Sequence, residues 1–167
     1  MTGAIRILGV DPGSGATGWG VIAQDGARLS FIAAGVIRPS RSLTRAGRLA
    51  AIYEGLSALI AAHVPDEAAV EETFVNASPR DALVLGEARG VALLAPALAG
   101  LPVAEYAANT IKKSVVGKGH AEKGQVAAMV RVLLPASGEQ AADASDALAV
   151  AICHAHHRAS LFLKATA

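Results

Sequence analysis

Short hydrophobic runs, broken by turn-forming residues, dominate the first forty positions of the chain. The runs at residues 5–10, 18–23 and 29–37 have the length and the flanking glycines or charges that are typical of β-strands. The sequence QDGAR between the second and third runs has the composition of a tight turn. We therefore expect three consecutive strands that form an antiparallel meander.

Helical periodicity follows. Apolar residues recur at helical spacing from Leu49 to Ile60 and predict a helix within residues 42–64, which Pro65 ends. Further on, the pattern predicts a strand at 67–75, a helix at 78–98, a strand at 101–107, and helices at 109–116, 121–134 and 137 to about 157.

Two of these helices carry recognisable start signals. Ser78 is suited to be an N-cap with Pro79 in the first helical position, and Ser137 with Gln140 has the spacing of a capping box. The order of elements predicts an α/β fold with a mixed five-stranded sheet flanked by helices. We expect a single domain over residues 1–167, with only the last few residues, about 162–167, loosely attached.

Composition narrows the class of protein. The chain has 167 residues, of which 53% are hydrophobic and 17% charged, so disorder is not expected. Cys153 is the only cysteine, and Arg6 and Asp11 interrupt the apolar N-terminus, which argues against a disulfide and against a signal peptide. The longest uncharged run, residues 90–104, is too short for a membrane helix. We expect a cytoplasmic protein with no membrane partner.

Four acidic residues occupy positions that solubility does not explain: Asp11, Glu71, Asp143 and Asp146. The first ends a strand, and the second lies in the fourth strand beside Glu72, which must point to the opposite face. The last two are three residues apart in the last helix, on a face that continues through apolar residues.

Converging carboxylates require a cation. Two of them at ~4 Å repel each other by about 4 kcal/mol at an effective dielectric constant near 20. Oxygen ligands favour Mg²⁺, with Mn²⁺ as a substitute, and two such ions can promote phosphodiester hydrolysis. Taken singly, each acid has a simpler interpretation: Asp11 as a turn residue, Asp143 as a helix cap, and Glu71 or Glu72 as an exposed acid of an edge strand.

Basic and aromatic residues point to a nucleic acid. The net charge is only +1, but Lys112, Lys113, Lys118 and Lys123 fall within one short segment, which is either a phosphate-binding patch or a solvated surface. Phe74 follows the fourth strand, where it either stacks on a base or belongs to the core.

Five segments resemble the sequence blocks of the RuvC family of Holliday-junction resolvases. In chain order they read LGVDPGSGATGWGVI, AVEETF, LGEARGV, VVGKGHAEK and ADASDALAVAICH, and they extend from about residue 5 to residue 157. The resemblance implies a ribonuclease H-like fold and a homodimeric endonuclease that makes paired, two-fold symmetric nicks in four-way DNA junctions. It also implies branch-migration partners of the RuvA and RuvB type and a thymine-rich cutting sequence.

The resemblance also implies roles for individual residues. Asp11, Glu71, Asp143 and Asp146 correspond to the family's catalytic acids, which would hold two Mg²⁺ ions per subunit. Phe74 corresponds to an aromatic residue that stacks on bases near the crossover, and Lys112 and Lys123 to lysines that contact DNA near the scissile phosphate. Lys118, between two glycines, is expected to reach the DNA backbone from a loop.

Three other functions compete with this interpretation. The first strand and turn also fit an ATPase of the actin and sugar-kinase type, although such proteins need two lobes. A junction-binding module without catalysis, and another ribonuclease H-like nuclease, are the remaining alternatives.

Two further groups of residues are the small residues of the helix at 78–98 and the histidines near the C-terminus. The small residues Ala82, Gly86 and Gly90 fit either a dimer contact or tight packing on the sheet. We interpret the histidines His154, His156 and His157 as cations at a helix end, without a catalytic role.

Overall fold

The computed structural model describes residues 3–73 and 78–165. Its elements follow in the order β1 (Ile5–Asp11), β2 (Thr17–Asp25), β3 (Arg28–Ile37), α1 (Arg45–His63), β4 (Glu67–Glu72), α2 (Pro79–Leu98), β5 (Val103–Ala107), α3 (Ala108–Val116), α4 (Lys123–Leu133), a 3₁₀ turn (Pro135–Ser137) and α5 (Ala142–Ala165). Among the described residues, no helix is both long enough and apolar enough to cross a membrane.

The five strands form one mixed sheet in the order β3-β2-β1-β4-β5. β1, β2 and β3 are antiparallel neighbours, whereas β4 and β5 join the β1 side of the sheet in parallel. The predicted meander and the predicted α/β fold are therefore confirmed. Because β1 and β4 are parallel neighbours, the ends of both strands lie at the same edge of the sheet.

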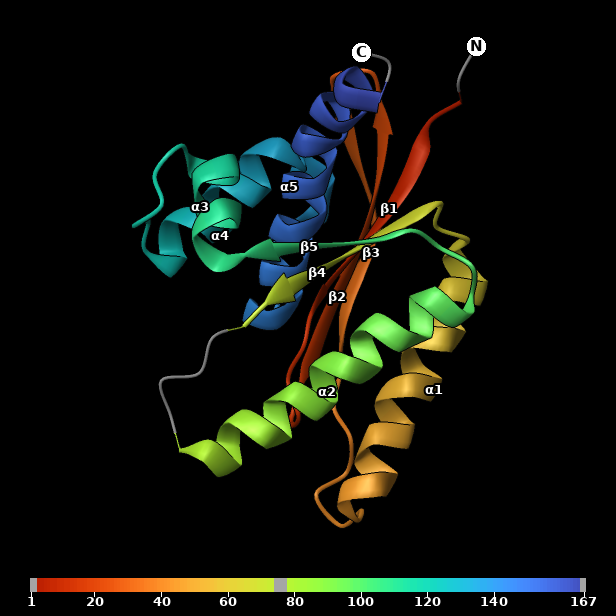
Figure 1. Cartoon of the computed structure of the whole chain (residues 1–167). Helices are drawn as coiled ribbons and strands as arrows, with labels where there is room; N and C mark the ends of the chain where they lie inside the picture. The colour runs from red at the N-terminus through yellow and green to blue at the C-terminus, as the bar shows by residue number, and fades with distance from the viewer. Residues whose placement is uncertain (1–2, 74–77, 166–167) are drawn as a thin grey trace.

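Helices cover both faces of the sheet, α1 and α2 on one side and α3, α4 and α5 on the other (Figure 1). Alternation along β1 supplies both cores: Ile7 packs toward α5, whereas Leu8 and Val10 pack toward α1 and α2. The sheet is thus buried on both faces, and α5 lies across its centre.

Three glycines let α5 approach the sheet closely. A Cβ atom at Gly18 would overlap with the backbone carbonyl oxygen of Asp143, and one at Gly9 would overlap with the backbone of Ala147. A Cβ atom at Gly20 would come within 2.6 Å of the Leu148 side chain. Register places these glycines on one face, because Gly9 pairs with Gly20 and Asp11 with Gly18. We call Gly9, Gly18 and Gly20 the glycine platform.

The predicted helix boundaries are partly right. Ser78 is the N-cap of α2, with its hydroxyl accepting from the Asp81 amide, and Pro79 opens that helix. α1 ends at His63, where Val64 adopts a left-handed conformation (φ 47°) directly before Pro65. The next helix, α4, begins at Lys123, two residues later than predicted.

The predicted start and end of the last helix are wrong. Ser137 donates its hydroxyl proton to the Leu134 carbonyl at 2.7 Å, and Gln140 donates to the Ser137 carbonyl, so the predicted capping box does not form. The helix begins at Ala142 and continues to Ala165, well past His157. The three histidines therefore do not lie at a helix end, and that interpretation is also wrong.

Candidate active site

Asp11 occupies the last position of β1, where the chain turns toward β2. Thr17 stabilises this turn: its hydroxyl donates to the Gly13 carbonyl at 2.8 Å and accepts from the Gly13 amide at 3.3 Å. Asp11 pairs with Gly18 across the antiparallel ladder, so its side chain lies beside the glycine platform. The tight turn and the missing side chain at Gly18 together leave this carboxylate next to α5.

Glu71 comes from the neighbouring strand. β4 runs parallel to β1, with Val70 in register with Val10, which places Glu71 level with Asp11. Glu71 acts on Asp11 through its charge and through side-chain hydrogen bonding, and both effects raise the pKa of Asp11. Glu71, rather than Glu72, is therefore the acid on the α5 face of the sheet.

Asp146 reaches the same place from α5. It lines a pocket of about 250 Å³ together with Asp11, Glu71 and Lys112. Asp143 lies one turn earlier, in the first turn of α5, and does not line this pocket. Its charge nevertheless acts on Asp11.

Electrostatics at the site reflect this convergence. Burial, followed by the carboxylates of Glu71, Asp146 and Asp143, raises the pKa of Asp11 from its ordinary 3.8 to about 8. Each of these effects disfavours the charged form of the side chain. The structure thus brings the other three predicted acids close enough to Asp11 to act on it electrostatically, although the four come from three separate elements.

The donor set fits a hard divalent cation. All four side chains are carboxylates, the ligands that Mg²⁺ and Mn²⁺ prefer, and a cation would relieve the repulsion that raises the pKa of Asp11. Within residues 3–73 and 78–165, however, no group of three or more Asp, Glu, His or Cys side chains is already arranged as a metal cage. Because the pKa of Asp11 is raised, binding an ion near neutral pH displaces the proton that this side chain favours.

Two of the predicted DNA-binding residues have described side chains, Lys112 and Lys118, and of these Lys112 lines the pocket. It belongs to α3, where its neighbour Ile111 is buried and its neighbour Lys113 is exposed. Lys118 is exposed in the loop between α3 and α4. Lys123 opens α4, but its side chain lies outside the described part of the chain. Phe74 also lies outside the described residues.

Two contributors to the site were missed in the sequence. The glycine platform sets the distance of α5 from β1. The spacing of Gly18 and Gly20, two residues apart in β2, indicates in the sequence that one face of this strand lacks side chains. Arg89 of α2 donates to the backbone carbonyl of Glu71 at 3.3 Å and forms an ion pair with Glu105 of β5. No local pattern marked Arg89, because its partners are distant in the sequence.

Comparison with known proteins agrees with this geometry. A family model described as crossover junction endodeoxyribonuclease RuvC matches residues 7–154. A protein of that name from Methylocella silvestris is 64% identical over 157 residues, which are 94% of this chain and 89% of the relative.

Solved structures show the same fold. The RuvC structure from Thermus thermophilus superposes with a TM-score of 0.83 at 31% identity, covering 93% of this chain and 96% of that one. RuvC from the same organism in complex with a Holliday junction substrate also gives a TM-score of 0.83, at 33% identity over 92% and 94% of the two chains. Since the matched segment contains all four acids, the pocket and the glycine platform, the chain belongs to the RuvC family of crossover junction endodeoxyribonucleases.

Proposed function

We propose that this protein is a metal-dependent endonuclease that resolves four-way (Holliday) DNA junctions by paired symmetric nicks, in recombination and repair. The observation that carries this proposal is the convergence of Asp11, Glu71 and Asp146 with Lys112 around one open pocket. Membership of the RuvC family and the likeness to a RuvC bound to a Holliday junction support the substrate.

The four acids would hold the metal. Asp11, Glu71, Asp143 and Asp146 would bind two Mg²⁺ ions per subunit, with Mn²⁺ as a substitute, and bound ions activate water and neutralise charge on the scissile phosphate. Hydrolysis forms a bond from the water oxygen to phosphorus and breaks the bond to the 3′ oxygen. The products are a 5′-phosphate and a 3′-hydroxyl, without a covalent enzyme intermediate.

Basic side chains would bind the DNA backbone. Lys112 would donate to an oxygen of the scissile phosphate from within the pocket, where it opposes the charge that develops during attack. Lys118 and Lys123 would contact phosphates further along the strand, and Phe74 would stack on a base near the crossover. These roles extend the acidic pocket into a surface for junction DNA.

Replacing Lys112 by alanine should lower kcat about tenfold or more, because a donor to the reacting phosphate is lost. The slope of log binding constant against log salt should also become shallower by about 0.9, the value for one lost phosphate contact. Lys113→Ala is the matched control, since this exposed neighbour lies outside the pocket and should retain its kcat. Equal kcat values for the two variants would contradict the proposed role of Lys112.

α2 presents a surface suited to a second copy of the chain. Ala82, Gly86 and Gly90 are exposed, and a Cβ atom at either glycine would meet nothing within 4 Å. Packing on the sheet, one of the two interpretations of these small residues, is therefore wrong; Ala88, Ala92 and Ala95 take that side of the helix instead.

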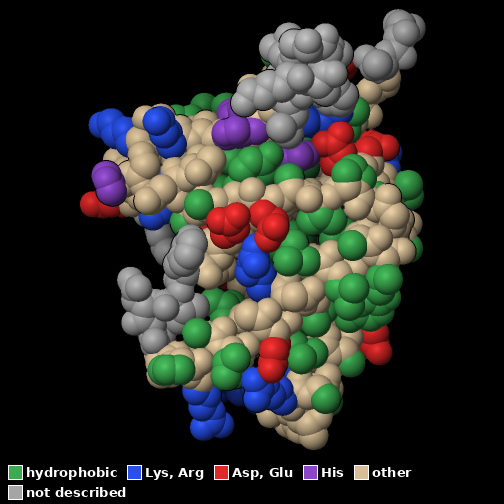
Figure 2. Space-filling model, in the orientation of Figure 1, with side chains coloured by type: hydrophobic (Ala, Val, Ile, Leu, Met, Phe, Trp, Pro, Cys, Tyr) green, Lys and Arg blue, Asp and Glu red, His purple; other side chains and the backbone are tan. Residues whose placement is uncertain are grey.

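Large apolar side chains are exposed on the same helix. Leu83 is 66% exposed and Leu98 64% exposed, and hydrophobic side chains recur along the part of the surface formed by α1 and α2 (Figure 2). Two symmetric nicks need two symmetry-related sites, which a C₂ dimer supplies. We place the dimer contact on this face of α2, and a RuvA/RuvB-type complex as the partner that moves the junction.

A charge on this surface should separate the subunits. Leu83→Asp is expected to raise the dimer dissociation constant at least 100-fold, because an aspartate would be buried without a partner. Val132→Asp is the control, since Val132 is equally exposed, at 68%, and belongs to α4, on the other side of the sheet from α2 (Figure 1). Sedimentation at micromolar concentration measures the oligomeric state of both variants and of the wild type. A monomeric wild type would count against the proposed dimer.

The proposed function is tested by nicking of a labelled mobile junction with Mg²⁺, beside linear duplex DNA and an RNA–DNA hybrid. We expect paired symmetric nicks in the junction alone. Tight binding without cutting would indicate a binding module, and cutting of the hybrid would indicate a ribonuclease H.

A further inference from the structure

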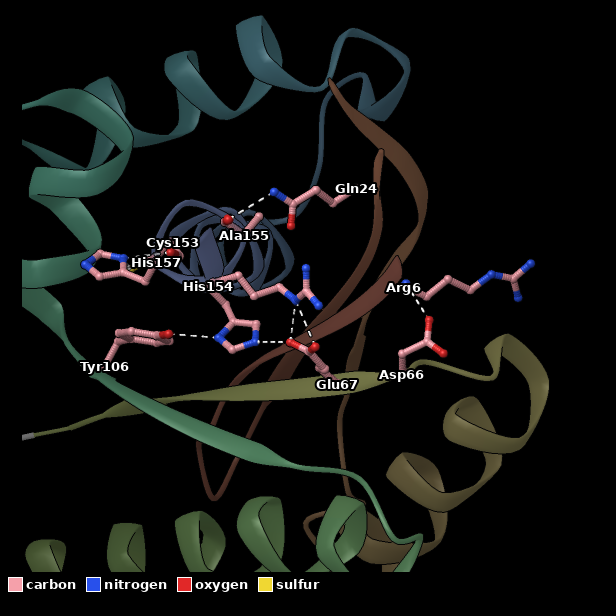
Figure 3. A network of polar contacts seen from close by, with 10 residues as sticks. Arg6, Gln24, Asp66, Glu67, Tyr106, Cys153, His154, Ala155 and His157 are labelled. Atoms are coloured by element: carbon pink, nitrogen blue, oxygen red, sulfur yellow. Dashed lines mark hydrogen bonds and ion pairs between the residues drawn. The ribbon is translucent and has the colours of Figure 1, made fainter. Parts of the chain in front are cut away.

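A network of buried and half-buried polar side chains, none of which lines the acidic pocket, joins α5 to β4 and β5 (Figure 3). His154 Nε2 lies 2.7 Å from a carboxylate oxygen of Glu67, and its Nδ1 lies 2.8 Å from the Tyr106 hydroxyl. Arg158 Nε donates to both oxygens of Glu67 at 2.8 Å. We call Glu67, Tyr106, His154 and Arg158 the anchor network.

The direction of each hydrogen bond follows from its partners. Glu67 faces Arg158 and accepts as a carboxylate, so Nε2 of His154 carries the proton and Nδ1 accepts from Tyr106. Burial lowers the pKa of His154, against the opposing effect of Glu67, and burial raises the pKa of Tyr106 to about 12. A neutral imidazole and a protonated phenol are the forms that this chain of bonds needs.

Glu67, His154 and Arg158 share an element with the acids of the active site, and Tyr106 comes from the strand next to β4. Glu67 and Glu71 lie four residues apart in β4, on the same face and about 13 Å apart. His154 follows Asp146 by eight residues in α5, which is about 12 Å of helix. Tyr106 is the residue of β5 in register with Glu71. Because the two spacings match, fixing His154 on Glu67 also fixes where Asp146 stands relative to Glu71.

Stability alone is a weak reason for such a network. His154 is only 5% exposed, and burying a polar or charged group costs free energy that its partners only partly return. Apolar residues of similar volume would hold α5 on the sheet at no greater cost, but without a directional constraint. A helix that slips by one residue moves by 1.5 Å and turns by about 100°. The hydrogen bonds from His154 and Arg158 to Glu67 prevent such a slip, because they would be lost in any other register.

We propose that the anchor network sets the register of α5 on β4 and β5, and thereby positions Asp143 and Asp146 for metal binding opposite Asp11 and Glu71. This inference rests on the proposed metal-dependent cleavage. Its members act through α5 and β4 and touch no substrate, so they are positioning residues. The glycine platform fixes how closely α5 approaches the sheet, and the anchor network fixes its place along and around its axis.

The test compares Tyr106→Phe and Glu67→Gln with His156→Gln. Tyr106→Phe removes one hydroxyl without changing the ring, and Glu67→Gln removes the charge that Arg158 faces. His156 is the control, because it is an exposed histidine of α5 whose ring contacts Ser114 rather than the network. Mn²⁺ affinity is measured by electron paramagnetic resonance on the full chain without DNA, followed by kcat and KM for junction nicking and by thermal unfolding.

We expect Tyr106→Phe and Glu67→Gln to weaken Mn²⁺ binding and lower kcat by about tenfold, in the range known for residues that orient metal ligands, with KM nearly unchanged. His156→Gln should match the wild type. Lower melting temperatures with unchanged Mn²⁺ affinity and kcat would show a purely structural role and overturn the proposal. If the wild type binds Mn²⁺ but cuts no junction, the proposed function fails, and the Mn²⁺ affinities still decide the role of the network. No Mn²⁺ binding by the wild type would overturn both.

Discussion

Replacing Asp146 by asparagine is expected to reduce junction nicking by about 1,000-fold or more, a loss of ~4 kcal/mol of transition-state stabilisation. Asp146 shares the pocket with Asp11 and Glu71, and an amide removes one of the charges that would hold the metal. The substitution preserves the size of the side chain, so binding of the junction in the absence of metal should remain. Nicking under single-turnover conditions, beside a junction-binding assay, measures both effects.

The same substitution should stabilise the metal-free protein. Asp146 is among the carboxylates that raise the pKa of Asp11 to about 8, so its removal relieves repulsion in the folded state. In the wild type, the folded protein keeps a proton on Asp11 that the unfolded chain releases above its ordinary pKa of 3.8. The free energy of unfolding should therefore fall as the pH rises from about 4 to about 8, and it should fall less in Asp146→Asn.

Asp25→Asn serves as the control for both effects. Asp25 is an exposed acid at the other end of β2 from Thr17, and its replacement should leave nicking intact and stability within about 0.5 kcal/mol. Full nicking activity in Asp146→Asn would contradict a catalytic role for this residue. Lower stability of the metal-free variant at pH 8 would contradict the repulsion among the acids.

Adding a single methyl group at Gly18 is expected to cost about 3 kcal/mol of stability. The new Cβ atom would overlap with the backbone carbonyl of Asp143, and backbone atoms of a packed helix cannot move aside as a flexible side chain can. α5 would have to move away from the sheet at the turn that carries Asp143 and Asp146. Nicking at a temperature where the variant is still folded should therefore fall at least tenfold.

Gly15→Ala is the matched control for Gly18→Ala. Gly15 belongs to the same glycine-rich segment, is exposed, and has nothing within 4 Å of the position of an added Cβ atom. Chemical denaturation should leave the Gly15 variant within about 0.5 kcal/mol of the wild type. Equal stabilities of the two alanine variants would show that α5 does not need the bare strand surface.

The sheet was predictable because its signals are local. The runs in β1, β2 and β3 are short, apolar and separated by turn residues, and the alternation in β4 required Glu71 and Glu72 to face opposite sides. The register of Val10 with Val70 decides whether Glu71 or Glu72 points toward Asp11, and alternation alone does not give that register.

The last helix shows where local signals fail. Ser137 and Gln140 have the spacing of a capping box, but the chain after Pro135 forms a 3₁₀ turn that uses the Ser137 hydroxyl. His154 looked like one of three equivalent histidines, because its partner Glu67 is 87 residues away. Partners that meet only in the folded chain leave no trace in a local pattern. Neither Arg89 nor the anchor network was therefore predictable.

The position of α5 over the glycine platform also constrains how the protein is made. Asp11 and Glu71 leave the ribosome before Asp143 and Asp146, which lie on α5, the last helix in the described part of the chain. α5 docks on β1 and β2, more than one hundred residues earlier in the chain, so this contact closes late in folding. A nascent chain therefore carries only half of its acidic site until α5 has been synthesised. The order of residues along the chain thus leaves the acidic site incomplete until α5 has docked on the sheet.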